Sequence, residues 1–134
     1  MKRFLLNFAK SKKGLNFEWG ITDCHILTFE AIDTMFYTKF AELIKETYNS
    51  YESAIQAHTV FGKNMEEFLK ENNFYEVPIN FEQLGDILIV DGVSWQMCHV
   101  SLGDGKVMSV NIGGKVEFIP LSLIDPYKIL RRDY

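Results

Sequence analysis

The sequence has 134 residues, of which 47% are hydrophobic and 24% are charged. This length and composition exclude wholesale disorder and collagen-like repeats and suffice for one hydrophobic core, so we expect a single domain over 1–134. The chain carries 14 Lys and Arg against 18 Asp and Glu and has no long basic stripe, which argues against nucleic acid as a partner.

The N-terminal segment 3–10 has apolar residues at helical spacing, followed by a polar break that ends at Gly14. Its apolar run is six residues long and is interrupted by Asn7. Such a run is too short for a secretory signal or a membrane span, so we expect synthesis in the cytoplasm without a signal peptide, and no membrane partner.

The front half continues with helical patterns. Thr22 and Asp23 are both good N-cap residues, so a second helix is expected to begin at Cys24. Apolar residues at three- and four-residue steps predict a further amphipathic helix over 36–48. Two shorter helices are expected over 51–60 and 64–72, the latter capped by Asn64.

From Gly85 onward the residues favour strands. Segments rich in β-branched and aromatic residues are separated by Gly and Asp, and they predict strands over 87–90, 95–102, 106–111, 115–119 and 127–130. We therefore expect an α+β fold, in which N-terminal helices (about 1–75) pack on a C-terminal antiparallel β-meander (about 84–131).

The two cysteines, Cys24 and Cys98, are too few for a disulfide framework, and neither has a second cysteine at zinc-ligand spacing. His25, His58 and His99 show no recognised metal-ligand spacing either, so we expect no metal and no cofactor. Free cysteines are often simply buried core residues. Cys24 stands apart because a helix N-terminus favours a thiolate, and the aromatic residues before it are expected to form the wall of a cleft.

His99 is the second candidate for chemistry. Strand alternation places it on one face with Met97 and Ser101, whereas Cys98 and Val100 lie on the other face. If 103–105 is a three-residue loop, Leu102 pairs with Lys106 and His99 lies opposite Ser109, with Asn111 diagonal to it. A two-residue loop instead places Val110 opposite His99. In the first register a polar neighbour would fix the imidazole tautomer, as in a catalytic triad.

His25 follows Cys24 directly in the predicted helix. Adjacent helical residues point in different directions, so we expect His25 to point away from the face of the thiol and to flank the site.

The motifs that carry these residues resemble those of the NlpC-type cell-wall cysteine peptidases, which are papain-like. Segment 17–24 (FEWGITDC) is similar to the family's aromatic-x-Trp-Gly…Asp-Cys signature. Segment 84–90 (LGDILIV) is similar to its Gly-Asp strand, and segment 98–108 (CHVSLGDGKVM) resembles its histidine hairpin. The short form, with a helical insertion before Gly-Asp, resembles the compact members found in phage-tail and gene-transfer-agent modules.

The resemblance implies a role for each matching residue. Cys24 is the nucleophile and His99 is the general base. Ser109 or Asn111 is the third, polar residue. Asp23 helps to recognise the free amino end of a stem peptide, while Phe17 and Trp19 belong to the substrate site. His25 and Ile26 replace the family's small Ser-Gly pair, so His25 is expected to reshape the acceptor subsite.

The function implied is a cysteine hydrolase that cleaves peptide or isopeptide bonds of peptidoglycan stem peptides. A virion tail, or the host cell envelope after delivery, is the expected location, with phage tail proteins as partners. Two alternatives use the same fold: a non-catalytic tail or assembly module, and a cysteine amidase or acyltransferase that acts on another amide.

Overall fold

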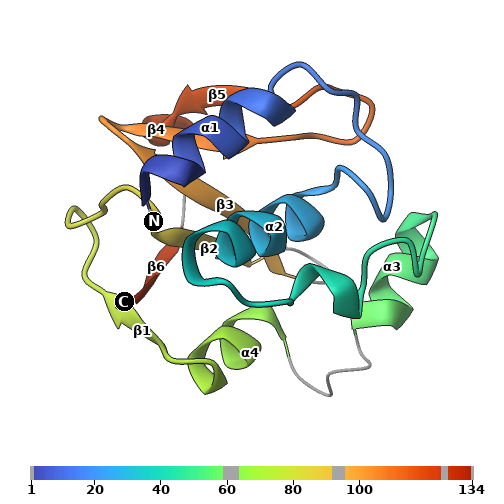
Figure 1. The fold of residues 1–134 in the computed structure, drawn as a ribbon, viewed down its shortest axis with the longest axis horizontal. Helices are drawn as coiled ribbons and strands as arrows, with labels where there is room; N and C mark the ends of the chain where they lie inside the picture. The colour runs from blue at the N-terminus through green and yellow to red at the C-terminus, as the bar shows by residue number, and fades with distance from the viewer. Residues whose placement is uncertain (1, 59–63, 92–95, 125–126, 134) are drawn as a thin grey trace.

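The computed structural model describes residues 2–58, 64–91, 96–124 and 127–133, and its helices come before most of its strands (Figure 1). The helical elements are α1 (Lys2–Lys12), α2 (Cys24–Phe36), the 3-10 turn η1 (Ala41–Leu43), α3 (Tyr51–His58), α4 (Met65–Glu71) and the 3-10 turn η3 (Leu121–Leu123). The strands are β1 (Phe74–Val77), β2 (Ile87–Asp91), β3 (Gln96–Gly103), β4 (Lys106–Ser109), β5 (Glu117–Pro120) and β6 (Lys128–Arg132).

The six strands form one sheet in the order β1-β6-β2-β3-β4-β5, and every neighbouring pair is antiparallel. Strands β2 to β5 form the meander that the sequence predicts. Strand β6 returns beside β2 and joins β1 to the sheet. The α+β fold, with N-terminal helices on an antiparallel sheet, is therefore confirmed.

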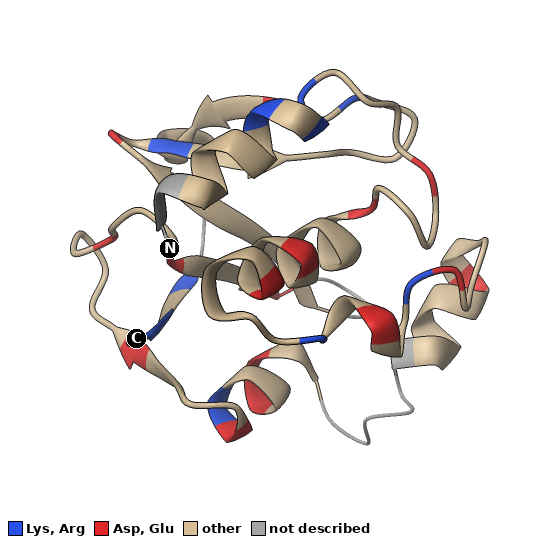
Figure 2. Cartoon of the chain, viewed as in Figure 1, with Lys and Arg blue, Asp and Glu red and all other residues tan. Residues whose placement is uncertain are grey.

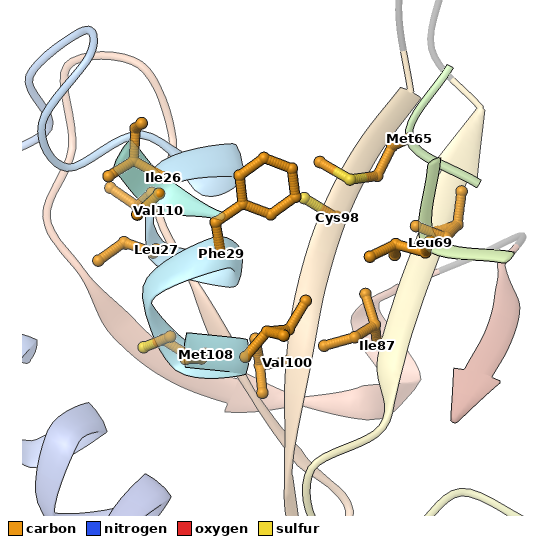
Figure 3. Packing of buried hydrophobic residues seen from close by; sticks show 14 of the residues in the cluster. Ile26, Leu27, Phe29, Met65, Leu69, Ile87, Cys98, Val100, Met108 and Val110 are labelled. Atoms are coloured by element: carbon orange, nitrogen blue, oxygen red, sulfur yellow. The ribbon is translucent and has the colours of Figure 1, made fainter. Parts of the chain in front are cut away.

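Helices α1 and α2 lie on the same face of the sheet, and α2 packs against β3 (Figure 1). The main hydrophobic core fills the space between these two helices and the sheet. Figure 3 shows Phe29 of α2 beside Cys98 of β3, with Val100 and Ile87 close by on neighbouring positions of the sheet. Cys98 thus belongs to the face of the sheet that α2 covers.

The opposite face of the sheet has a smaller apolar cluster of its own. Its buried members are Leu88 of β2, Val107 of β4 and Leu121 of η3. Leu88 pairs with His99 across β2 and β3, whereas the adjacent Ile89 pairs with Cys98. Because successive residues of a strand point to opposite faces, His99 shares the Leu88 face and Cys98 does not.

The predicted helix over 36–48 is wrong. Helix α2 continues to Phe36, Tyr37 then adopts a left-handed backbone conformation (φ 57°), and only the short turn η1 follows. The Asp33 carboxylate explains the change of direction, because it accepts the N–H groups of Phe40 and Ala41. Hydrogen bonds from backbone N–H groups to a side-chain carboxylate compete with helical hydrogen bonds. Here they outweigh the helical preference that the apolar spacing indicates.

Other elements follow the predictions more closely. Helix α4 begins after Asn64, which forms a capping box with Glu67. The predicted helix over 51–60 is observed as α3, and its last two residues lie outside the described residues. Strand β1 was not predicted, and the predicted strands 106–111 and 115–119 are observed as β4 and β5 with shifted bounds.

The β3–β4 hairpin combines the two registers that the sequence leaves open. Gly103 pairs with Lys106 around a two-residue turn, which is the second of the two loops that the sequence leaves open, so Leu102 does not pair with Lys106. The register then shifts between Ser101 and Gly103, and Val100 pairs with Met108. This irregularity, a β-bulge, absorbs one residue. Continuing the shifted register by one residue aligns His99 with Ser109.

Within the described part of the chain, every helix is too short or too polar to cross a membrane. Figure 2 shows Lys and Arg in blue on α1, Asp and Glu in red on α2, and both colours on α4.

Candidate functional site

The loop before α2 is held by the carboxylate of Asp23, the N-cap residue of that helix. Its Oδ1 accepts the Ile26 N–H at 3.0 Å, and its Oδ2 accepts the Gly20 N–H at 2.8 Å. The Tyr48 hydroxyl also donates to Oδ2, at 2.6 Å. These bonds fix the first turn of α2, and with it Cys24, relative to segment 46–48.

Gly20 is required in this loop for two reasons. Its φ of +78° lies in the left-handed region, and a Cβ built on it would lie 2.3 Å from the Tyr48 carbonyl oxygen. The Gly20 carbonyl also accepts the Glu46 N–H at 2.9 Å. The Trp-Gly element of the motif therefore allows two backbone segments to approach each other beside Cys24.

The imidazole that contacts the Cys24 thiol is that of His25. Cys24 Sγ lies 3.7 Å from His25 Nδ1, and His25 Nε2 lies 2.6 Å from the carbonyl oxygen of Gln96 on β3. Because a carbonyl oxygen only accepts hydrogen bonds, Nε2 carries a hydrogen and Nδ1 is the atom presented to the sulfur. The expectation that His25 points away from the thiol is wrong.

A second thiol completes this arrangement. Cys98 Sγ lies 3.5 Å from the Cys24 carbonyl oxygen, to which it donates. The Sγ atoms of Cys24 and Cys98 and a ring nitrogen of His25 all lie within 4.8 Å of one another. His25 and Cys98 are buried, whereas Cys24 is half-buried. We call Cys24, His25 and Cys98 the thiol–imidazole cluster.

The charges in this cluster favour a thiolate on Cys24. The contact with the Cys98 thiol lowers the pKa of Cys24, burial opposes this, and the neighbouring His25 adds to it, so the net shift is well below the ordinary value. Burial by itself lowers the pKa of His25, but the Cys24 charge and hydrogen bond outweigh it, so the net shift is upward. The pKa of Cys98 is raised by burial and by the nearby Cys24.

His99 lies outside the thiol–imidazole cluster. It is on the sheet face shared with Leu88, and among the described residues no hydrogen bond joins it to Cys24. Its Nδ1 is buried without a hydrogen-bond partner in the described chain. Burial lowers the pKa of His99 more than the charge of Cys24 raises it. His99 thus interacts with Cys24 through charge and not through a hydrogen bond of the described structure, and its role as general base stays a prediction.

The two candidates for the third residue do not hold an imidazole in the described structure. Ser109 is buried at the end of β4, at the position aligned with His99. Asn111 is exposed in the turn after β4, where its carbonyl oxygen accepts the Gly114 N–H at 2.8 Å. The group that holds the ring in contact with Cys24 is instead the Gln96 carbonyl.

The expected substrate-site residues surround the start of α2. Phe17 and Trp19 are half-buried and meet edge to face at 4.8 Å between ring centroids, and Trp19 also contacts Tyr51. Asp23 is 1% exposed and has both oxygens occupied by the bonds described above. Its recognition of a stem-peptide amino group stays a prediction, while its contribution as an N-cap is evident.

Sequence reasoning missed three contributors to this site: Tyr48, Gln96 and Cys98. Gln96 acts through its backbone carbonyl, which any residue type supplies, so no sequence signal marks it. Tyr48 is 25 residues from Asp23 in a segment with an unexpected conformation. Cys98 is next to His99, and the predicted alternation already separated the two residues onto opposite faces.

Comparison with known proteins supports the fold. The solved structure of RipD from Mycobacterium tuberculosis, described as a non-catalytic NlpC/p60 domain protein adapted to peptidoglycan binding, superposes with a TM-score of 0.62 at 15% identity. The superposition covers 97% of this chain and 95% of that one, which confirms the expected NlpC-like fold. No curated protein matches the chain. The family model described as "Domain of unknown function (DUF6950)" matches residues 2–126, so the chain belongs to that family.

Proposed function

We propose that this chain is a cysteine hydrolase that cleaves peptide or isopeptide bonds of peptidoglycan stem peptides, with Cys24 as the nucleophile and His25 as the general base. The observation that carries the proposal is the alignment of the Cys24 thiol, the His25 imidazole and the Gln96 carbonyl. The thiol and Nδ1 of His25 are 3.7 Å apart, and the opposite ring nitrogen is anchored at 2.6 Å on the Gln96 carbonyl. A nucleophile, a base and a group that orients the base are the parts that thiol catalysis requires.

The position of Cys24 adds two favourable effects. As the first residue of α2, it lies at the positive end of the helix dipole, which stabilises a thiolate. Its backbone N–H belongs to the first helical turn and has no acceptor within the helix, so it is suitably placed to donate to an oxyanion.

The reaction has two balanced stages. The Cys24 thiolate attacks the amide carbonyl carbon, the C–N bond breaks, and protonated His25 gives its Nδ1 hydrogen to the leaving amine. His25 then takes a proton from water, the resulting hydroxide attacks the thioester, and the Cys24 thiolate leaves with a carboxylic acid as the second product. No cofactor takes part in either stage.

Peptidoglycan is proposed as the substrate on two grounds. The motifs around Cys24 resemble those of cell-wall cysteine peptidases, and RipD, which has a similar fold, is described as peptidoglycan-binding. Peptidoglycan is accordingly the proposed binding partner of the hydrolase.

A binding module without turnover is the second candidate. The observation that favours it is the burial of the base, because His25 is 2% exposed and Cys98 is 1% exposed beside it. Two hollows in the described part of the chain, of about 580 and 300 Å³, are lined by residues other than Cys24. RipD itself is described as non-catalytic.

The deciding experiment compares the wild-type chain with Cys24→Ala, His25→Ala and His99→Ala on purified peptidoglycan. Soluble fragments are identified by mass spectrometry, and binding is measured by co-sedimentation. The proposal expects fragments with new amino and carboxyl termini from the wild type and from His99→Ala, and none from Cys24→Ala or His25→Ala. Mass spectrometry also separates peptide hydrolysis from attack on a different amide.

The other outcomes are equally informative. Release by His25→Ala together with loss of release by His99→Ala would assign the base to His99 and overturn the geometry proposed here. Co-sedimentation without release by any variant would establish the binding module. Neither release nor co-sedimentation would reject peptidoglycan as the partner.

We further propose a phage tail as the setting, with tail proteins as partners and with the virion or host envelope as the location. The support is the compact arrangement of the Trp-Gly…Asp-Cys and Gly-Asp motifs. Mass spectrometry of purified tailed particles tests this setting, and absence of the chain from such particles would reject it.

A further inference from the structure

We propose that Cys24, His25 and Cys98 form a binding site for one soft divalent metal ion of the zinc class, a property that goes beyond the proposed hydrolase. Two thiols and an imidazole form a donor set that zinc prefers. The three donor atoms converge within 4.8 Å of one another although they come from two distant parts of the chain.

The spacing of the donors fits a tetrahedral ion. Zinc–sulfur and zinc–nitrogen bonds of about 2.3 and 2.0 Å place tetrahedral ligand atoms roughly 3.5 to 3.8 Å apart. The observed distance from Cys24 Sγ to His25 Nδ1 is 3.7 Å, which already matches. The other separations in the group are at most 4.8 Å, so the sulfur of Cys98 needs to move by no more than about 1.3 Å.

The orientation of His25 is the one that metal-binding histidines adopt. Its Nε2 lies 2.6 Å from the Gln96 carbonyl, which leaves Nδ1 directed at the Cys24 sulfur. Metal-ligating histidines almost always donate their other ring N–H to a carbonyl or carboxylate. Gln96 and Cys98 are two residues apart on β3. This strand therefore supplies one ligand, Cys98, and also the carbonyl that orients a second ligand, His25.

Burial and charge also suit a metal ion. Cys98 and His25 lie in the apolar interior, where an uncompensated ion would be strongly disfavoured. Two thiolates neutralise the charge of a divalent ion, so the loaded site carries no net charge. Binding transfers the Cys98 thiol proton, and any hydrogen on Nδ1, to the solvent. Cys24 is half-buried, so we expect water as the fourth ligand on its side.

Ligand spacing in the sequence does not mark this site. Cys24 and His25 are adjacent, and Cys98 is 74 residues away from Cys24. Such a site becomes visible only when β3 is packed against the start of α2. The loaded protein is expected to lack hydrolase activity, because the ion occupies the nucleophile, but the test of the site does not depend on activity.

The test uses the reduced full-length chain after treatment with a chelator, with Co²⁺ as the probe. We expect one Co²⁺ per chain, sulfur-to-cobalt charge-transfer absorption in the near ultraviolet, and loss of that absorption when Zn²⁺ is added. Cys98→Ser is expected to weaken binding by at least about 100-fold, since loss of even an outer-shell partner costs 10- to 100-fold. His99→Ala, the adjacent imidazole on the opposite face, serves as the matched control and should bind as the wild type does.

Circular dichroism verifies that Cys98→Ser is folded, and Cys24→Ala supplies a second ligand variant with a different neighbourhood. Absence of thiolate absorption at millimolar Co²⁺, or equal binding by Cys98→Ser and the wild type, would overturn the proposal. The proposal would also be overturned if Cys24 and Cys98 formed a disulfide in air but bound no Co²⁺ when reduced. Because Co²⁺ binding is read without substrate, its failure is distinct from any failure to cleave peptidoglycan.

Discussion

The Tyr48 hydroxyl donates a 2.6 Å hydrogen bond to Asp23, the residue that caps the helix beginning at Cys24. Burial and the adjacent carboxylate raise the pKa of Tyr48, so its hydroxyl remains a donor at neutral pH and through the ordinary tyrosine range. The start of α2 is therefore fixed by a residue 25 positions away as well as by its own cap.

Tyr48→Phe tests the value of this bond. The substitution keeps the ring but leaves a buried carboxylate oxygen with one donor fewer, which is expected to cost about 1 to 3 kcal/mol of the free energy of unfolding. Urea denaturation measures the loss. Tyr51→Phe, at a more exposed tyrosine, is the control, and an equal effect of the two substitutions would contradict the assignment.

Asp23→Asn is expected to change how stability depends on pH. Burial raises the pKa of Asp23 above its ordinary value of 3.8 despite the hydrogen bonds that oppose it. The folded state therefore holds the proton more tightly than the unfolded state. The stability gained by protonation is complete below pH 3.8 and is lost as the pH rises through the folded-state pKa.

Asn also caps helices but does not titrate, so the wild-type stability minus that of Asp23→Asn should fall from about pH 4 to about pH 7. The limit is about 1.4 kcal/mol per pH unit. Denaturation of both proteins at both pH values measures the difference. Groups that do not interact with Asp23 cancel in it, whereas Cys24 and His25 interact with Asp23 and contribute to it. A difference that rises with pH would show that the carboxylate is stabilised in its charged form.

Gly20→Ala is expected to cost at least about 2 kcal/mol, because it adds a strained left-handed conformation to a direct clash with the Tyr48 carbonyl. Gly14→Ala is a matched control. Gly14 also has a positive φ, of +87°, but nothing lies within 4 Å of its added Cβ, so about 1 kcal/mol of strain is expected. Thermal unfolding compares the two variants, and equal losses would mean that the clash relaxes without cost.

Arg131→Ala tests the Gly-Asp motif. Asp86 is 1% exposed, and Arg131 binds it in a bidentate manner, with Nε and a terminal nitrogen at 2.9 and 2.8 Å. Removal of the partner leaves a buried charge, at an expected cost of about 3 to 5 kcal/mol. Lys128→Ala breaks an exposed ion pair to Glu66 and should cost less than about 1 kcal/mol. Similar losses measured by denaturation would contradict the ranking.

Alkylation by iodoacetamide tests the state of the Cys24 thiol. The lowered pKa of Cys24 and the raised pKa of Cys98 predict that Cys24 reacts at least about tenfold faster near neutral pH. Its rate should stay high as the pH falls below the ordinary cysteine range and should drop in His25→Ala but not in His99→Ala. Peptide mapping by mass spectrometry assigns each rate, and equal rates for the two cysteines would mean that Cys24 is not activated.

Local signals in the sequence were sufficient to predict the start of α2 and the β2–β5 meander. The Asp23 cap and the Gly and Asp turns act through their immediate neighbours, so their effects can be read from the chain itself. The segment 36–48 failed because Asp33 accepts backbone N–H groups seven and eight residues later, which the apolar spacing does not reveal. Strand β1 is short and is stabilised by pairing with β6, more than 50 residues away.

In the candidate site too, local features were predicted from the sequence and features that depend on distant contacts were not. Cys24 was identified from local features, whereas its imidazole partner was not. Helical geometry alone directs His25 away from Cys24. The Gln96 carbonyl on β3 accepts a hydrogen bond from Nε2 of His25, and this bond orients Nδ1 toward the Cys24 sulfur. The choice between His25 and His99 therefore depended on tertiary packing, which a single sequence does not provide.

The interior position of β6 has a consequence for biosynthesis. This strand is the last of the six to be translated, yet it separates β1 from β2 and supplies the hydrogen-bonding edge for both. While the chain is still emerging from the ribosome, the meander and the first two helices can assemble, but β1 has no edge to join. Closure of the sheet therefore awaits the release of residues 128–132 from the exit tunnel, and a nascent chain stalled earlier would expose the unpaired edge of β2 to chaperones.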